Sequence, residues 1–212
     1  EWNDRTFTDF YTDRTSGSPT FNQDFAFNLS GVNALHQGIE VDFTDKPTDR
    51  LTITGMGSLG DWTWRNNVLD VPVFNDAQER IATVDLFIKD LKVGDAAQTT
   101  AALGVKYKFW KKTSLTVDYN YYANLYSDYD PNDRVSEGPQ PWKVPNYNLF
   151  DAGLRHGFEI GGFDTTITAR MNNVFNTEYI SDAQDQTSHT ATDALVWYGF
   201  GRTFSLSAKI KF

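Results

Sequence analysis

Val196-Trp197-Tyr198-Gly199-Phe200-Gly201-Arg202-Thr203-Phe204-Ser205-Leu206-Ser207-Ala208-Lys209-Ile210-Lys211-Phe212 is the stretch that decides the fold. From Tyr198 onward, apolar side chains stand at every second position except Arg202, and small or polar residues stand between them. Side chains alternate between the two faces of a β-strand, so one face of this segment is apolar and the other polar. We therefore expect one strand that runs from Val196 to the terminal Phe212.

The same alternation recurs through the chain, and no comparable stretch has helical spacing. It predicts an all-β, antiparallel fold of about eight strands, beginning with a segment near Trp2–Tyr11. The alternating stretches after that first segment span 35–44, 51–59, 100–109, 115–121, 150–158 and 166–172.

The connections between these stretches are asymmetric in length. Tight turns are expected at 45–49, 110–112 and 159–163, whereas long polar connections are expected at 66–96, 127–145 and 176–193. The first long connection contains apolar runs that predict a hairpin turning at Asn75–Arg80. Short turns at one end and long loops at the other are the layout of a transmembrane β-barrel.

Alternation alone does not say which face meets water, since lipocalins place the apolar face inside and membrane barrels place it outside. The apolar face persists for the ~9–11 residues that a tilted strand needs to cross a bilayer. The polar face is rich in threonine, serine, glycine and asparagine, and aromatic residues cluster at strand ends in two girdles. As membrane-interface aromatics we expect Trp62, Trp64, Trp110, Phe158, Trp197 and Tyr198. The alternative is a soluble all-β domain whose aromatic residues form its core.

Composition narrows the choice of partner and compartment. The net charge of -9 at pH 7 and the absence of a lysine and arginine cluster in the sequence argue against a nucleic-acid partner. The chain has no cysteine, which excludes disulfides and thiolate metal sites. No stretch approaches the ~18 consecutive apolar residues of a membrane helix. The chain begins mid-pattern at Glu1, so we interpret it as a mature or partial polypeptide.

Two motifs suggest chemistry that their surroundings do not support. The run Gly55-Met56-Gly57-Ser58-Leu59-Gly60 matches the dinucleotide fingerprint, but a strand pattern follows it where that site needs a helix N-terminus. The run Asp128–Asp133 offers oxygens that suit calcium, but it lacks the EF-hand glycine and bidentate glutamate. A turn stabilised by Asp and Pro is the simpler interpretation of that second run.

No catalytic set emerges from the sequence. The histidines His36, His156 and His189 lack metal-ligand or nucleophile spacing, and His156 falls in the apolar register of its strand. We therefore expect no enzyme activity, no cofactor and no metal site.

Charged and amide side chains of mixed sign fall on the expected polar face, where neighbours can pair across strands or grip an internal plug. They are Glu40, Asp42, Lys106, Lys108, Asp118, Asn120, Asp151, Arg155, Arg170, Lys209 and Lys211.

The last part of the chain resembles the closing hairpin of TonB-dependent outer-membrane receptors. The similar segments are Asn172-Asn173-Val174-Phe175-Asn176-Thr177-Glu178-Tyr179 and Gly199-Phe200-Gly201-Arg202-Thr203-Phe204, followed by a terminal Phe. Further similar segments are Gly38-Ile39-Glu40-Val41, Gly94-Asp95-Ala96-Ala97-Gln98 and Trp142-Lys143-Val144-Pro145-Asn146-Tyr147 before Leu149-Phe150-Asp151. These segments together resemble receptors from Bacteroidota. Ser205 departs from the glycine that the family's insertion signal favours.

The resemblance implies a barrel of about 22 strands around an N-terminal plug, of which this chain supplies the last third. It implies the bacterial outer membrane as location and import of a scarce nutrient such as a ferric siderophore. The implied partners are outer-membrane lipid, the TonB complex acting through the plug, the barrel insertion machinery and the nutrient. Residues implied to contact ligand are Phe74, Tyr129, Trp142 and Tyr179, and the implied assembly signal comprises Phe204, Leu206, Ile210 and Phe212.

Two alternatives remain at this stage. The segment could act as an assembly or structural partner in a larger outer-membrane complex. It could also close alone as a small porin-like barrel with a filled interior.

Overall fold

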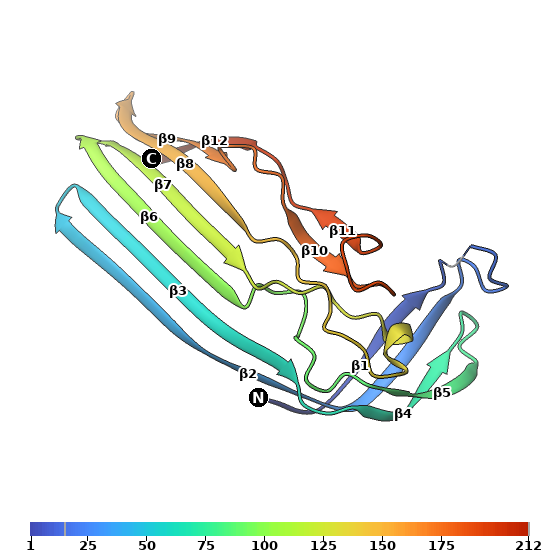
Figure 1. Ribbon diagram of the computed structural model, residues 1–212. Helices are drawn as coiled ribbons and strands as arrows, with labels where there is room; N and C mark the ends of the chain where they lie inside the picture. Colours follow the sequence, from blue (N-terminus) through green and yellow to red (C-terminus); the bar gives the residue numbers. More distant parts are fainter. Residues whose placement is uncertain (15, 212) are drawn as a thin grey trace.

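The computed structural model describes residues 1–14 and 16–211, which fold into antiparallel β-sheets (Figure 1). This confirms the all-β, antiparallel fold class. The strands are β1 (Trp2–Thr12), β2 (Asp24–Thr48), β3 (Leu51–Trp64), β4 (Val68–Phe74), β5 (Arg80–Leu86), β6 (Thr99–Trp110), β7 (Thr113–Ala123), β8 (Tyr147–Ile160), β9 (Phe163–Asn172), β10 (Ile180–Gln184), β11 (Leu195–Tyr198) and β12 (Thr203–Lys211), and the 3-10 helix η1 is Pro131–Arg134.

Ten strands form one sheet in the order β12-β9-β8-β7-β6-β3-β2-β4-β5, with β1 paired to β2. The strand β2 is long enough to pair with three strands: β1 along residues 24–34, β4 at Ala26 and Phe27, and β3 along residues 34–48. Within the described residues no ladder joins β12 to β1, β2 or β5, so the sheet does not close on itself.

The two ends of the sheet differ in the length of their connections, as predicted from the sequence. Three tight hairpins gather at one end, where β2 meets β3, β6 meets β7 and β8 meets β9 (Figure 1). We call this the short-turn end. The long connections gather at the other end, and the first of them contains the predicted hairpin of β4 and β5. Its turn is closed by Asn75, whose backbone N–H donates to the Glu79 carbonyl at 3.1 Å.

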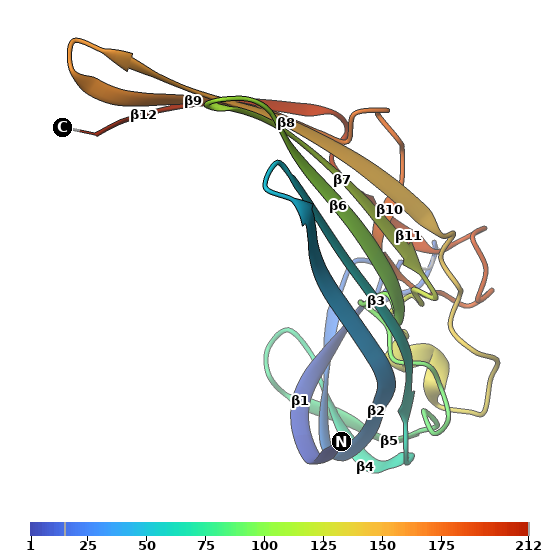
Figure 2. The ribbon, with the colours of Figure 1, turned by 90° about the vertical axis from the view of Figure 1, so that its left-hand side faces the viewer.

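We call β3, β6, β7, β8, β9, β12 and residues 35–48 of β2 the wall. Register keeps its apolar residues opposite one another: Val105 faces Val117, and Leu154 lies between Leu115 and Ala169. The large side chains of this face are exposed, with Leu206 at 76% and Ile39 at 69%. Successive strands twist and curve the wall along its width (Figure 2). The apolar face is therefore continuous and has no protein cover within the described residues.

The glycine run at 55–60 lies inside β3, so it opens no helix and holds no dinucleotide phosphate. A Cβ at Gly55 would lie 2.3 Å from a ring atom of Phe43, the residue directly opposite on β2. The glycine thus makes room for a neighbouring aromatic ring, as glycines in strands often do.

The structure corrects the expectation of one terminal strand from Val196 to Phe212. Leu195–Tyr198 forms β11 and pairs with β10, residues 199–202 lie outside the strands, and Thr203 begins β12. The break has a local cause, because asparagine side chains satisfy backbone groups that a ladder would otherwise use. The Asn176 Oδ1 atom accepts from the Arg202 N–H at 2.9 Å, and the Asn173 amide donates to the Phe200 carbonyl at 3.3 Å. Phe212 lies outside the described residues.

Opposite the short-turn end, the connections fold into a packed structure that we call the loop end. It comprises β1, residues 24–34 of β2, β4, β5, η1, β10, β11 and the segments that join them. One buried apolar cluster centres on Leu29, Val71 and Leu86, and a second contains Leu125, Val144 and Ala183. These side chains are shielded from water by protein, unlike those on the apolar face of the wall.

Candidate functional site

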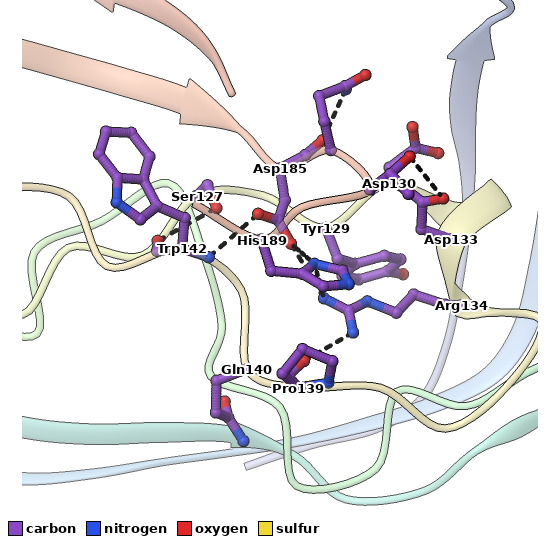
Figure 3. A network of polar contacts seen from close by, with 12 residues as sticks. Ser127, Tyr129, Asp130, Asp133, Arg134, Pro139, Gln140, Trp142, Asp185 and His189 are labelled. Atoms are coloured by element: carbon purple, nitrogen blue, oxygen red, sulfur yellow. Dashed lines mark hydrogen bonds and ion pairs between the residues drawn. The ribbon is translucent and has the colours of Figure 1, made fainter. Parts of the chain in front are cut away.

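The loop end is the candidate functional surface, and a buried ion pair ties its segments together (Figure 3). Arg134, the last residue of η1, is 0% exposed, and its guanidinium lies 3.1 Å from the Asp185 carboxylate, which is 1% exposed. The guanidinium also donates to the Pro139 carbonyl at 2.8 Å. The second Asp185 oxygen accepts from the Trp142 N–H at 3.2 Å. Segments more than 40 residues apart in sequence therefore share one buried charge pair.

His189 belongs to the same network. Its Nδ1 atom lies 2.5 Å from the Asp185 carboxylate and 3.3 Å from the Arg134 guanidinium. Among the described residues, no serine or threonine hydroxyl bonds to the His189 ring. The network joins η1 to the segment that follows β10.

The short helix η1 is positioned by a side-chain cap and by the strand next to it. Asp130 caps the helix, its carboxylate accepting from the Asn132 N–H at 2.8 Å, and Pro131 occupies the first helical position. The Arg134 carbonyl accepts from the Phe87 N–H at 2.7 Å, which joins η1 to the segment after β5. The run Asp128–Asp133 is thus the predicted Asx and Pro turn. Residues 1–14 and 16–211 contain no group of three or more His, Cys, Asp or Glu residues that could hold a metal ion.

Carboxyl groups of the loop end are desolvated and crowd one another. Burial, reinforced by the carboxylates of Asp9 and Asp95, raises the pKa of Asp128 to about 8. Burial likewise raises the pKa of Asp130 to about 7, against the lowering effect of its hydrogen bond from Asn132. The pKa of Asp95 is raised by burial and by the neighbouring carboxyl group of Asp182. The loop end therefore carries less negative charge at pH 7 than its aspartate count suggests.

The residues expected to contact ligand do not converge on one site. Tyr129 is 2% exposed and belongs to the first apolar cluster, while Trp142 packs against the second. Tyr179 lies 4.5 Å from Tyr147 between ring centroids, in a row that continues to Tyr122. Phe74 ends β4 opposite Ala26. Of the four, Tyr129 is too deeply buried to reach a ligand in this structure.

The expected interface aromatics also lie in different surroundings. Trp110, Trp197 and Tyr198 are exposed at 71%, 51% and 60%, respectively. Trp64 instead is buried in the first apolar cluster, with its ring 6.1 Å from that of Tyr129 in an edge-on contact.

The remaining aromatics of that set, Trp62 and Phe158, lie beside histidine rings. The ring centroids are 5.3 Å apart for His36 and Trp62, and 5.6 Å apart for His156 and Phe158. Of the expected assembly signal, Phe204, Leu206 and Ile210 lie exposed on β12, an open edge of the sheet.

Sequence reasoning missed the Arg134–Asp185–His189 network. Arg134 and Asp185 are 51 residues apart, and charged residues in polar loops are usually solvated, so no local pattern distinguished this pair. Only the spacing of Asp185 and His189, four residues apart, offered a signal.

Comparisons with known proteins add no identity. No family model matches the chain, and no curated protein matches it. Among the described residues there is no helix long and apolar enough to cross a membrane.

Proposed function

We propose that the chain is part of the barrel of a TonB-dependent outer-membrane transporter that imports a scarce nutrient such as a ferric siderophore. In this proposal the wall crosses the outer membrane, lipid covers its apolar face, and the loop end faces the cell exterior as part of the capture surface. The protein would act by binding and transport rather than by covalent catalysis.

The observation that carries the proposal is the uncovered apolar face of the wall. Soluble proteins rarely expose contiguous apolar patches larger than a few hundred Å². Here the exposed set extends across all strands of the wall and includes Ile39, Val41, Phe43, Leu59, Leu103, Tyr107, Leu115, Val117, Leu154, Ile167, Phe204, Leu206 and Ile210. Lipid is the solvent that makes such a face favourable.

The opposite face supports a hydrated interior. Arg170 lies 3.5 Å from the Asp118 carboxylate and 3.9 Å from that of Asp151, on neighbouring strands. Of the charges expected on this face, Arg170, Asp118 and Asp151 thus pair across strands. Alternation of lipid-facing and lumen-facing residues is the pattern of outer-membrane barrels.

The open edges favour a segment of a larger barrel over a small barrel that closes alone. One edge is the free side of β12, and the other is the side of β2 along residues 35–48 that faces away from β3. A membrane wall must pair both edges, because unpaired backbone groups in hydrocarbon cost several kcal/mol each.

Lipid contact is tested with the full-length protein reconstituted in vesicles that contain brominated acyl chains. A tryptophan introduced at Leu206 should be quenched strongly, whereas one introduced at the adjacent Ser207 should not, in a background whose native tryptophans are replaced by phenylalanine. Equal quenching at both positions, or a protein that stays folded and monomeric in buffer without detergent, would overturn the membrane assignment.

Transport is tested separately by deleting the full-length gene. The deletion strain should take up less of one labelled nutrient when grown on defined iron and carbon sources. If uptake of every nutrient tested is unchanged while the lipid-contact result stands, the barrel assignment survives and the import function fails.

A further inference from the structure

Three tyrosine rings form a stacked row where the polar face of the wall meets the loop end. Tyr122 of β7 and Tyr147 of β8 are directly opposite each other, and their ring centroids are 4.8 Å apart. The ring of Tyr179, in the segment between β9 and β10, lies 4.5 Å from that of Tyr147, so Tyr147 contacts both other rings. We call these three residues the tyrosine row. In the part of the chain that the structure describes, no other two tyrosine rings are in contact.

The tyrosine row stands on the polar face of the wall and is open to water. Asp118 and Asp151 lie opposite each other on that face. Tyr122 and Tyr147 stand an even number of residues away from them along β7 and β8, so their side chains leave the sheet on the same side. All three rings of the row are half-buried rather than sealed in a core. Water-soluble reagents can therefore reach them.

The hydroxyl groups of the row have no structural role in the protein. Among the described residues none of them makes a hydrogen bond, whereas the hydroxyl of Tyr121, on the other face of β7, accepts from the Asn146 amide at 3.3 Å. A second stacked row contains Tyr119, Phe150 and Phe175, with ring centroids 4.8 and 5.1 Å apart, and so packs with a single hydroxyl. Phenylalanine would therefore serve the packing of the tyrosine row as well, and its three phenols need another explanation.

Phenols held in contact are arranged for oxidative coupling. Loss of one electron and one proton turns a phenol into a phenoxyl radical, whose unpaired electron is shared with the ring carbons next to the C–O carbon. Two such radicals join through these carbons, and each ring then moves its displaced proton to the oxygen, which restores both phenols. With hydroxyl radicals as the oxidant, two tyrosines and two radicals give one dityrosine and two water molecules. Coupling requires that the rings meet before the radicals react elsewhere, and the contacts within the row meet that requirement.

We propose that the tyrosine row is an oxidative cross-linking site, at which a one-electron oxidant such as the hydroxyl radical joins Tyr147 to Tyr179. This pair is favoured because coupling needs the two rings to turn from a stacked contact to an edge-to-edge contact. Tyr122 and Tyr147 are both fixed in a strand ladder, whereas Tyr179 lies outside the strands. The new bond would attach the segment before β10 covalently to β8, so the wall and the loop end stay joined when the loop end opens. The proposal is independent of the import function, because it needs only the geometry of the row and a water-soluble oxidant.

The first test oxidises the full-length protein with persulfate and a photoexcited ruthenium tris-bipyridyl complex, which together supply a one-electron oxidant. Mass spectrometry of the digested protein then locates each dityrosine. We expect Tyr147–Tyr179 as the main product within the chain and Tyr122–Tyr147 as a minor one. Tyr147→Phe should remove both products, whereas the matched control Tyr121→Phe, on the other face of β7, should leave them unchanged. A larger yield of dityrosine between other tyrosines of these residues, or none within the chain, would overturn the proposal.

Gly199 allows a test of the geometry itself. A Cβ at this position would lie 2.0 Å from a ring atom of Tyr179, so Gly199→Ala must displace that ring. The Tyr147–Tyr179 product should fall by about tenfold or more, because a misplacement of about 1 Å between reacting groups can cost about a hundredfold in rate. The Tyr122–Tyr147 product should persist and shows that the sheet is folded. Gly57→Ala is the matched control, because its Cβ meets nothing within 4 Å. An unchanged ratio of the two products in Gly199→Ala would sink the proposal.

Cells that make the full-length protein show whether the site reacts under living conditions. They are exposed to hydrogen peroxide in iron-replete medium, where ferrous iron converts peroxide to hydroxyl radicals, and the cross-linked peptides are measured in the purified protein. We expect the Tyr147–Tyr179 product to rise with the peroxide dose and to be absent in Tyr147→Phe. Oxidised tyrosine elsewhere in the protein without any Tyr147–Tyr179 product would contradict the proposal.

Discussion

The wall and the loop end belong to the same chain, but the loop end buries its apolar side chains and the wall exposes them. Every hydrophobic side chain that is nearly inaccessible among the described residues lies at the loop end or at the strand ends that border it, as with Phe27, Leu86 and Val144. The wall instead exposes its apolar side chains, and its middle carries paired charges on the other face. The loop end therefore has its own buried apolar core, whereas the stability of the wall depends on the solvent that covers its apolar face.

The largest effect is expected from breaking the buried charge pair of the loop end. Arg134→Ala leaves the Asp185 carboxylate buried without its cation, which should cost about 3–5 kcal/mol of local stability. Limited proteolysis of the full-length protein should show faster cleavage between 127 and 145. The matched control is Lys112→Ala, because its pair with Asp164 is exposed and should be worth about 1 kcal/mol or less. Equal protection of both variants would mean that the network does not hold the loops.

The next effect distinguishes the two faces of the wall. Leu206→Arg places a cation on the apolar face and should lower the free energy of unfolding in vesicles by about 2–4 kcal/mol if that position lies near the bilayer midplane. Ser207→Arg, on the polar face, should change it by about 0.5 kcal/mol or less. Urea titration monitored by tryptophan fluorescence measures both. A similar decrease in the free energy of unfolding for the two variants would contradict the assignment of lipid to one face and water to the other.

A smaller effect is expected where the wall gives way to the loop end. A Cβ at Gly199 would lie 2.0 Å from a ring atom of Tyr179, so Gly199→Ala must displace that ring and should cost about 1–3 kcal/mol. Adding Tyr179→Ala should remove most of this penalty in a double-mutant cycle measured by urea titration. Additive costs would show that the clash does not determine the position of this segment.

The last expected effect is a pH dependence confined to the loop end. The raised pKa of Asp128, about 8, means that the folded state binds a proton more tightly than an unfolded chain, in which an aspartate titrates near 3.8. Stability from this group is therefore fully present below about pH 4 and is lost as pH rises through about 8. Hydrogen-exchange protection factors, which are corrected for the intrinsic pH dependence of amide exchange, should fall at the loop end over that range, and Asp128→Asn should reduce the change. Protection factors in the wall should stay constant over the same range, and an equal fall there would contradict the assignment.

Particular residues show how far the sequence predicted this molecule. Alternation at 100–109 and 115–121 predicted β6 and β7 and their faces, because a period of two is a local property of an extended chain. The same rule was wrong at residues 199–202, where Asn173 and Asn176 from an earlier segment interrupt the strand. The clustering of aromatic residues at strand ends placed Trp64 at a membrane interface, although the first apolar cluster buries it.

The candidate site was predicted less well than the fold. Sequence reasoning found no basic cluster, although Lys106, Lys108, Lys111 and Lys112 lie within seven residues. The sheet brings Lys209 and Lys211 of β12 to the same hollow as these lysines, because β6 and β12 belong to one sheet. The aromatic residues singled out for ligand contact were chosen by their position in loops, and loop position does not tell whether a side chain such as Tyr129 points inward.

The sequence by itself determined that this chain forms antiparallel strands with one apolar and one polar face, and at which end the short turns lie. Both properties depend on residues close together in the chain, through the alternation of side chains and the lengths of connections. Only the tertiary structure decided that Arg134 is buried against Asp185 and that lysines from separate strands share a hollow. Such contacts depend on which strands become neighbours and how loops pack over them, and that is settled by the whole sheet rather than by any single segment.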